Sequence, residues 1–313
     1  MNIVFLGSSH FAVSALEALI QAGYHISCVE TQPDKKKGRH LHLASTDVKL
    51  LAQKAGLKVF SPSAINSRES VEFISTLNED LFVIVAYGQI LSQEILDIPK
   101  LFSLNIHASL LPKYRGAAPI SWAIIFGEEY TGVSIMKVTR KMDSGPVLMQ
   151  EKVKIGDDDY VVLEDKLRKI GSCLLVKALK QIENNACSFK EQVEKEVVFA
   201  PKLKKLDGYI DWSRTPQEIH NLVRGTIPWP GAHTYFKNKL LKIFKSKIIL
   251  KLDIPANCSS GEVIEVSKDE IIVICGKGAL AIDELQLEGG RKMSAKDFIH
   301  GHKVQKGYIF GKK

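Results

Sequence analysis

The chain has 313 residues, of which 45% are hydrophobic and 25% are charged, and its formal net charge is +8. These values are typical of a soluble globular protein, and they exclude intrinsic disorder, a collagen-like fibre and a miniprotein stapled by disulfides. The apolar stretches are far shorter than the roughly 20 residues that cross a bilayer, so we expect no membrane segment. The N-terminus has no signal-peptide pattern and the five cysteines form no CxxC pair, which together predict a cytoplasmic protein with free thiols.

The positive charge is concentrated in the last third of the chain. Residues 201–313 hold 20 Lys and Arg against 12 Asp and Glu, an excess of +8, whereas residues 1–200 hold 23 of each kind. A local basic excess attracts polyanions and gains free energy when their counterions are released. Charge alone leaves two interpretations equally open, a nucleic-acid-binding surface and a solvated surface rich in lysine.

Short apolar runs alternate with amphipathic segments over residues 1–188. We expect strands at 3–6, 26–29, 57–60, 81–85, 101–107, 131–138 and 147–153, and helices at 11–22, 48–55, 71–77, 121–126 and 161–182. The run Leu81–Val85 is continuously apolar, which is typical of a strand that is covered on both faces. The alternation predicts an α/β domain, with a Rossmann-like, mostly parallel sheet and helices on both faces.

The pattern changes after residue 188. Residues 189–207 are polar and have no clean period, which predicts a linker. Beyond it we expect strands at 208–212, 233–236, 240–249, 261–266, 271–274 and 280–287, with a helix at 216–223 and a proline-rich turn at 227–231. Short strands at short intervals predict a smaller, OB-like β-barrel domain over residues 208–313.

Cofactor and metal motifs find little support in the sequence. The first strand-to-helix turn, Gly7–His10, is not GxGxxG, and no acidic residue is well placed for a ribose, so we expect no nicotinamide cofactor. The acidic run Asp157–Asp159 fits a solvated turn better than a metal site. The pairs His40-x-His42 and His300-x-His302 lack companion ligands at a recognisable spacing, so we expect no metal.

Three polar residues form a candidate acyl-transfer set. Asn105 and His107 lie two residues apart near the end of an expected strand, and Asp143 lies in a turn between two others. An amide can donate to a carbonyl oxygen, an imidazole can hold or deliver a proton, and a carboxylate can orient the imidazole or accept a proton from an attacking amine. Each residue also has a structural alternative. Asn105 could bond to a loop, His107 could be a buried histidine bonded to the backbone, and Asp143 could be a common turn residue.

Two motifs resemble those of the folate-dependent formyltransferases. One is Met142-Asp143-Ser144-Gly145-Pro146, and the other is the longer run Asn105-Ile106-His107-Ala108-Ser109-Leu110-Leu111-Pro112-Lys113-Tyr114-Arg115-Gly116. The continuation Gly116-Ala117-Ala118-Pro119-Ile120 is similar to the branch that acts on an aminoacyl-tRNA rather than to the glycinamide ribonucleotide branch. Weaker similarity extends over most of the chain, at 31–34, 85–88, 210–212 and 228–230.

The resemblance implies a particular reaction. A formyl group would pass from 10-formyltetrahydrofolate to the α-amino group of methionine esterified to initiator tRNA, by direct amine attack through a tetrahedral intermediate. No metal and no nicotinamide cofactor would take part, and nothing in the sequence demands more than a monomer. By resemblance, the catalytic residues are Asn105, His107 and Asp143, and the residues that line the folate site are Ser109, Leu110, Leu111 and Pro112.

The resemblance also implies a tRNA-binding loop and a division of labour between domains. Members of the family carry a loop after the second strand that reaches the acceptor stem, and its candidate phosphate contacts here are Lys35, Lys36, Lys37 and Arg39. A solvated basic loop is the alternative. After Arg39 the prolines and a lysine that are usual in the family are missing, which leaves the path of this loop open. The catalytic domain would be 1–188, the linker 189–207 and the tRNA-binding domain 208–313.

Two rival functions remain at this point. A formyltransferase acting on an amino-sugar nucleotide shares the His-x-Ser-Leu-Leu-Pro core, but a small sugar nucleotide needs no extended basic surface. A non-catalytic RNA-binding protein on the same fold is the second rival. The intact set of Asn105, His107 and Asp143 argues against it.

Overall fold

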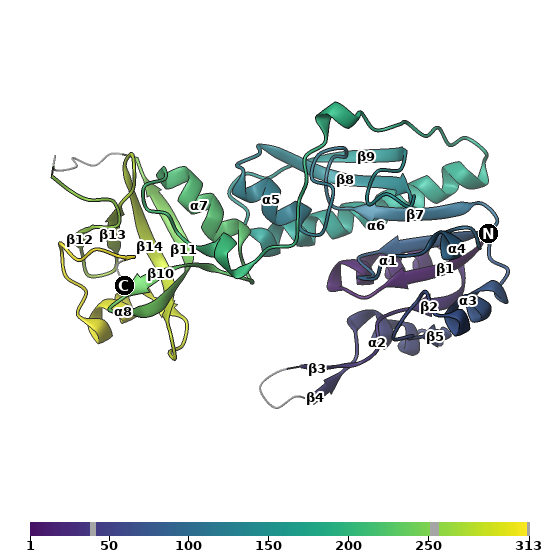
Figure 1. Cartoon of the computed structure of the whole chain (residues 1–313), viewed down its shortest axis with the longest axis horizontal. Coiled ribbons are helices and arrows are strands. Elements are labelled where there is room, and N and C mark those ends of the chain that lie inside the picture. The colour runs from purple at the N-terminus through teal and green to yellow at the C-terminus, as the bar shows by residue number, and fades with distance from the viewer. Residues whose placement is uncertain (38–41, 251–256, 312–313) are drawn as a thin grey trace. The chain divides into compact units, whose positions relative to one another are not determined.

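The computed structural model describes residues 1–37, 42–250 and 257–311, and its contacts divide the chain into two compact units (Figure 1). The first unit comprises Met1–Pro119, Tyr130–Lys154 and Glu164–Pro201. The second unit comprises Ile120–Glu129, Ile155–Leu163 and Lys202–Lys313. The segment 189–207, which the sequence predicts as a linker, is therefore shared between the two units.

A seven-stranded sheet forms the first unit, in the order β5-β2-β1-β6-β7-β8-β9. Neighbouring strands from β5 to β7 are parallel, whereas β8 is antiparallel to both β7 and β9. Because β8 alone runs opposite to the other six strands, the sheet is mixed and mostly parallel. The strands are β1 (Asn2–Gly7), β2 (His25–Glu30), β5 (Val59–Phe60), β6 (Leu81–Val85), β7 (Phe102–His107), β8 (Tyr130–Lys137) and β9 (Val147–Lys154).

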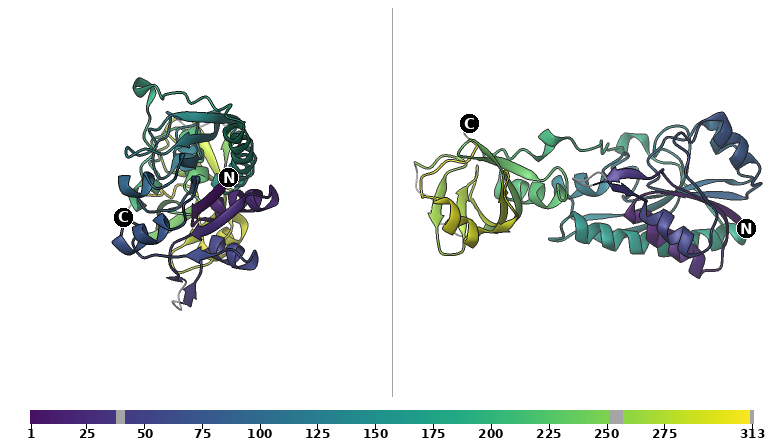
Figure 2. Two further views of the ribbon diagram at one scale, coloured as in Figure 1. Left: turned by 90° about the vertical axis from the view of Figure 1, so that its right-hand side faces the viewer. Right: turned by 90° about the horizontal axis from the view of Figure 1, so that it is seen from below.

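Helices lie on both faces of this sheet (Figure 2). On one face, apolar residues of β1, β2 and β6 pack with Ile74 and Ile95. On the other face, Gly171 lies so close to Ile106 that an added Cβ would be 3.0 Å from its side chain. The helices up to residue 183 are α1 (His10–Gln21), α2 (Asp47–Lys54), α3 (Arg68–Ser75), α4 (Gln93–Leu96), α5 (Pro119–Ile125) and α6 (Tyr160–Glu183).

The Rossmann-like α/β prediction is confirmed in the first unit. All five residues of β6 are buried, as its continuous apolar run indicates. The sequence did not reveal the hairpin of β3 (Lys35–Lys37) and β4 (His42–Ala44), nor the short helix α4. None of these three has an apolar period from which it could be predicted. Within the described ranges, no helix is long and apolar enough to cross a membrane.

An antiparallel sheet forms most of the second unit, in the order β10-β11-β14-β13-β12, with β15 paired to β14. The strand predicted at 208–212 is wrong, because η2 (Lys205–Gly208) is a 3₁₀ turn and only a single bridge, Tyr209 to His233, follows it. The other elements are α7 (Pro216–Gly225), β10 (Ala232–Phe236), β11 (Lys239–Ile249), β12 (Val263–Val266), β13 (Ile271–Ile274), β14 (Ala279–Leu287), β15 (Met293–Ser294) and α8 (Ala295–His302).

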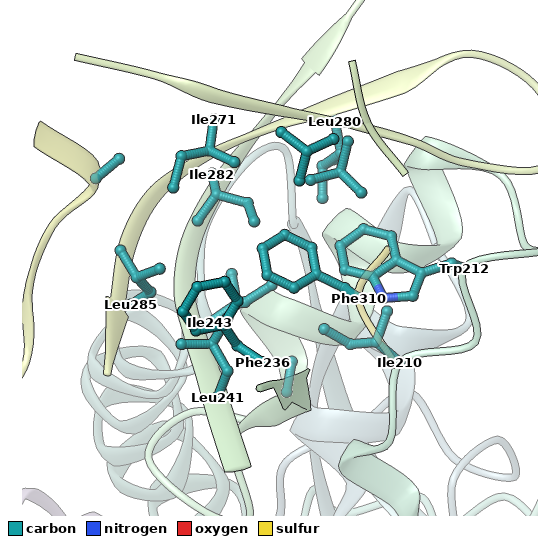
Figure 3. Packing of buried hydrophobic residues seen from close by; sticks show 14 of the residues in the cluster. Ile210, Trp212, Phe236, Leu241, Ile243, Ile271, Leu280, Ile282, Leu285 and Phe310 are labelled. Atoms are coloured by element: carbon teal, nitrogen blue, oxygen red, sulfur yellow. The ribbon is translucent and has the colours of Figure 1, made fainter. Parts of the chain in front are cut away.

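Two clusters of buried apolar residues lie in the second unit, and Figure 3 shows the larger one. Aromatic rings from distant parts of the unit meet in it. The ring of Phe236 lies 5.5 Å from that of Phe298 and 5.9 Å from that of Phe310, and Trp212 stacks on Phe310 at 6.1 Å. Ring pairs at these separations add to the free energy of burial.

The acidic run Asp157–Asp159 has a structural role in the second unit. Asp157 Oδ1 accepts a hydrogen bond from His220 Nε2 at 2.8 Å. Arg224 Nη1 donates to the carbonyls of Gly156 and Asp158 at 3.1 and 2.7 Å. Both side chains belong to α7, so the run fastens this helix to the start of α6. Among the described residues, no group of three His, Cys, Asp or Glu side chains could hold a metal ion.

A carboxyl group lies unpaired in the core of the first unit. The Glu30 side chain is fully buried on β2, and neither of its oxygens has a hydrogen-bond partner among the described residues. Burial raises the pKa of Glu30 from 4.5 to about 8. Between these two values the folded state binds a proton that the unfolded state has released, so the free energy of unfolding falls as the pH rises.

We expect Glu30→Gln to remove this dependence. In the wild type, Glu30 lowers the free energy of unfolding by up to about 1.4 kcal/mol per pH unit between pH 5 and 8. The variant should have a flatter profile and be more stable at pH 8, which urea unfolding at several pH values measures. The exposed Glu17→Gln is the matched control. If both variants kept the wild-type slope, a neutral buried Glu30 would be ruled out.

Candidate active site

The polar groups of the site lie where β6 and β7 end. Asn105 and His107 point to the same side of β7, because side chains alternate along a strand. The Asn105 amide donates through Nδ2 to the carbonyl of Ile84 on β6 at 3.2 Å. This bond uses one of the two amide hydrogens, and the second can donate to the oxygen of a bound substrate.

The ring of His107 is anchored by the backbone. Its Nε2 lies 2.9 Å from the carbonyl oxygen of Tyr114, and the residue is only 6% exposed. A carbonyl oxygen only accepts, so Nε2 must carry the hydrogen, and in the neutral ring Nδ1 is the atom left to take up a proton. Nδ1 lies 3.8 Å from Asp143 Oδ2. Nε2 therefore fits the structural alternative, a buried histidine bonded to the backbone. Nδ1 fits the catalytic interpretation, because it is open to a proton and faces a carboxylate.

The carboxylate of Asp143 is positioned by an unusual turn between β8 and β9. Asp143 has φ +49°, in the left-handed region that few residues other than glycine adopt. Its Oδ2 accepts a hydrogen bond from the backbone N–H of Gly116 at 2.8 Å. Two residues further on, a Cβ added to Gly145 would lie 1.8 Å from the carbonyl oxygen of Lys137. Only glycine allows this close approach of the turn to β8.

The loop after β7 is fastened by β8 and β9. The hydroxyl of Ser134 donates to the carbonyl of Ser109 at 2.6 Å and accepts from the N–H of Leu111 at 3.1 Å. Gln150 Nε2 donates to the carbonyl of Leu111 at 2.9 Å and to the Ser134 hydroxyl at 2.8 Å. The peptide bond between Leu111 and Pro112 is cis. The polar atoms of this turn are thus fixed before any ligand arrives.

The structure brings some of the predicted residues together and leaves others apart. Asn105 and His107 lie near the end of β7, and Asp143 approaches His107 from the turn between β8 and β9. The loop that directly follows β7 contains Ser109, Leu110, Leu111 and Pro112. Lys35, Lys36 and Lys37 form β3 of the hairpin, where Lys35 Nζ donates to Gln32 Oε1. Arg39 lies outside the described residues, as does His40.

Sequence reasoning missed two residues that support the site. Ser134 is a fully buried hydroxyl inside the apolar run of β8, and Gln150 is exposed on β9. A serine in the middle of a buried strand was a usable signal, because a buried hydroxyl requires a partner. The sequence offered no comparable signal for Gln150, whose partners are 16 and 39 residues away.

The chain matches known formyl transferases over both units. The family described as "Formyl transferase" matches residues 1–179, and the one described as "Formyl transferase, C-terminal domain" matches residues 202–303. The chain is 42% identical to a methionyl-tRNA formyltransferase of Acetivibrio thermocellus, covering 99% of this chain and 100% of that protein. It is 43% identical to one of Citrifermentans bemidjiense, covering 100% and 97%.

Its fold is similar to that of solved structures with much lower identity. One is an N-formyltransferase from Helicobacter canadensis in complex with folinic acid and dTDP-3-aminofucose, at a TM-score of 0.66 and 18% identity. The match covers 90% of this chain and 98% of that one. At this identity the similarity concerns the fold.

We expect Gly145→Ala to reduce formyl transfer strongly. Because the new Cβ would overlap the Lys137 carbonyl, the turn must shift and carry Asp143 with it. A displacement of about 1 Å can cost about 10²-fold in rate. Steady-state kcat, with circular dichroism to confirm folding, measures the effect. Gly301→Ala, where a Cβ meets nothing within 4 Å, is the control. A wild-type kcat for Gly145→Ala would show that the position of this turn is unimportant.

Proposed function

Because the chain belongs to the formyltransferase family, we propose that it transfers the formyl group of 10-formyltetrahydrofolate to the α-amino group of methionyl-initiator tRNA, the step that prepares this tRNA for translation initiation. The observation that carries the proposal is the approach of Asp143 to His107 at 3.8 Å, with Asn105 two residues before His107 on β7. The reaction needs no protein nucleophile, because the substrate amine attacks the formyl carbon. We place the enzyme in the cytoplasm as a monomer.

Each of the three residues has a role that its contacts support. The second hydrogen of the Asn105 amide can donate to the formyl oxygen, and this bond strengthens as the oxygen gains negative charge. His107 can take up or release a proton at Nδ1, because Nε2 is held by the Tyr114 carbonyl. Asp143 Oδ2 faces Nδ1, so the carboxylate can stabilise the ring electrostatically when Nδ1 takes up a proton.

The loop of residues 109–112 suits one side of a folate site. Ser134 on β8 and Gln150 on β9 fix its backbone by hydrogen bonds, while Leu110 and Pro112 stay partly exposed. An apolar turn with fixed polar atoms can hold a flat pterin and orient it through a few hydrogen bonds. We assign Ser109, Leu110, Leu111 and Pro112 to this site.

The basic excess supports tRNA as the acceptor. Residues 201–313 carry an excess of +8, and Lys202, Lys204 and Lys205 are exposed in the second unit. We assign tRNA binding to residues 208–313, with phosphate contacts from Lys35, Lys36, Lys37 and Arg39. An acceptor as small as a sugar nucleotide leaves this charge unexplained.

The acceptor is tested by offering donor labelled in the formyl group to three candidates in parallel. These are methionyl-initiator tRNA, glycinamide ribonucleotide and an amino-sugar nucleotide. We expect label on the tRNA alone, at a KM that rises steeply with salt because phosphate contacts release counterions. Label on the sugar nucleotide would replace the proposed acceptor. Label on none of the three would favour the non-catalytic RNA-binding alternative.

We expect His107→Ala to abolish most of the transfer and leave tRNA affinity unchanged. Loss of an acid–base group costs about 10²- to 10⁴-fold in rate. Single-turnover transfer measures the chemical step, and a filter-binding assay with labelled tRNA measures affinity. The exposed His25→Ala on β2 is the matched control. Near-normal transfer by His107→Ala would remove His107 from the catalytic residues.

A further inference from the structure

The segment Lys190–Ala200, called the strap below, is tied at both ends to the loops of the candidate active site. At one end, Lys190 and Val147 exchange backbone hydrogen bonds of 2.8 and 2.9 Å at the start of β9. At the other end, the N–H of Ala200 donates to the carbonyl of Arg115 at 2.7 Å, and the N–H of Arg115 donates to Val198 at 2.9 Å. The strap therefore spans the space between the Asp143 turn and the loop after β7.

Gln192 in the strap joins these two loops through its side chain. Its Nε2 donates to the carbonyl of Asp143 at 2.9 Å and to the carbonyl of Gly145 at 2.7 Å. Its Oε1 accepts a hydrogen bond from Arg115 Nε at 2.9 Å. A flipped amide would turn its oxygen toward two carbonyl oxygens, so the contacts fix its orientation. Both amide hydrogens are engaged on the turn that carries Asp143.

Arg115 holds the amide of Gln192 in place. Its guanidinium is only 1% exposed, and Nη2 donates to Glu194 Oε1 at 2.9 Å. Glu194 also pairs with Lys141, next to the Asp143 turn, at 3.0 Å. Hydrogen bonds from Arg115 and Lys141 hold the pKa of Glu194 below its usual range, so this side chain stays ionised. The strap thus contacts the turn at two points.

We propose that Gln192 is a positioning residue for formyl transfer, which acts by holding the backbone of the Asp143 turn so that the Asp143 carboxylate faces Nδ1 of His107. The inference rests on the proposed role of Asp143. Asp143 has a left-handed φ of +49°, a conformation that persists only where its surroundings enforce it. Gln192, which lies outside this turn, donates two hydrogen bonds to its carbonyls. Its neighbour Glu191 is exposed.

The test compares Gln192→Ala, Gln192→Glu and the control Glu191→Gln in the full chain. For Gln192→Ala we expect kcat to fall about 10- to 100-fold while the KM for 10-formyltetrahydrofolate stays within about threefold, because positioning acts on the chemical step. Glu191→Gln should keep the wild-type values. A Gln192→Ala variant within twofold of the wild type, or a loss confined to the donor KM, would overturn the inference.

The isosteric Gln192→Glu gives a readout that a purely structural role would not move. Its carboxylate has no hydrogen to give to the two carbonyls, whereas its protonated form regains one donor. The rate of Gln192→Glu relative to the wild type should therefore rise as the pH falls from about 7 to 4, through the usual pKa of a glutamate, while the relative rate of Gln192→Ala stays constant. A flat ratio for Gln192→Glu would overturn the proposal.

A structural measurement separates this inference from the proposed function. In a crystal structure of Gln192→Ala we expect the Asp143 carboxylate to have moved away from His107. If Asp143 Oδ2 remained 3.8 Å from Nδ1, the positioning role would fail whatever the acceptor is. If the turn moved but the wild type formylated none of the acceptors, the proposed function would fail, and of the inference only its structural part, that Gln192 holds the Asp143 turn in place, would stand.

Discussion

The hydrogen bond between His107 Nε2 and the carbonyl of Tyr114 is the constraint on which the candidate active site depends. It fixes the tautomer of a nearly buried ring and leaves Nδ1 as the atom that can exchange a proton. The carbonyl lies on a residue with φ +62°, so the loop after β7 must turn sharply to present it. The fold supplies that turn through Ser134 and Gln150, which hold the preceding residues of the loop from the neighbouring strands.

Much of the fold could be predicted because the residues that a helix or strand buries are apolar and recur at its characteristic spacing. The continuous apolar run of β6 and the amphipathic pattern of α6 follow directly from the faces that they bury. The reversal of β8 could not be predicted, since the same apolar run suits a parallel and an antiparallel neighbour. The strand expected at 208–212 fails for a related reason. Its apolar residues Ile210 and Trp212 are buried in the core of the second unit, but through a 3₁₀ turn and a single bridge.

The candidate site was less predictable than the fold, and it was reached through resemblance. Spacing placed Asn105 and His107 on one face of β7, but nothing local indicated that Asp143, 36 positions further on, would face His107. The residues that support the site were harder still to predict from the sequence. Ser134, Gln150 and Gln192 act through hydrogen bonds to the backbone of distant segments, and such contacts leave no periodic pattern. The strap has the polar composition of a linker because polar side chains make its contacts with the loops of the site.

The contacts of the site close into a ring that passes through Tyr114, Arg115 and Gly116. His107 bonds to the carbonyl of Tyr114, and Gly116 gives its N–H to Asp143. Gln192 holds the carbonyl of Asp143 and accepts from Arg115. The imidazole and the carboxylate therefore meet at 3.8 Å because three segments far apart in sequence are each fixed by the next. In such a ring no member is positioned alone, so we expect a change at any link to move the imidazole and the carboxylate relative to each other.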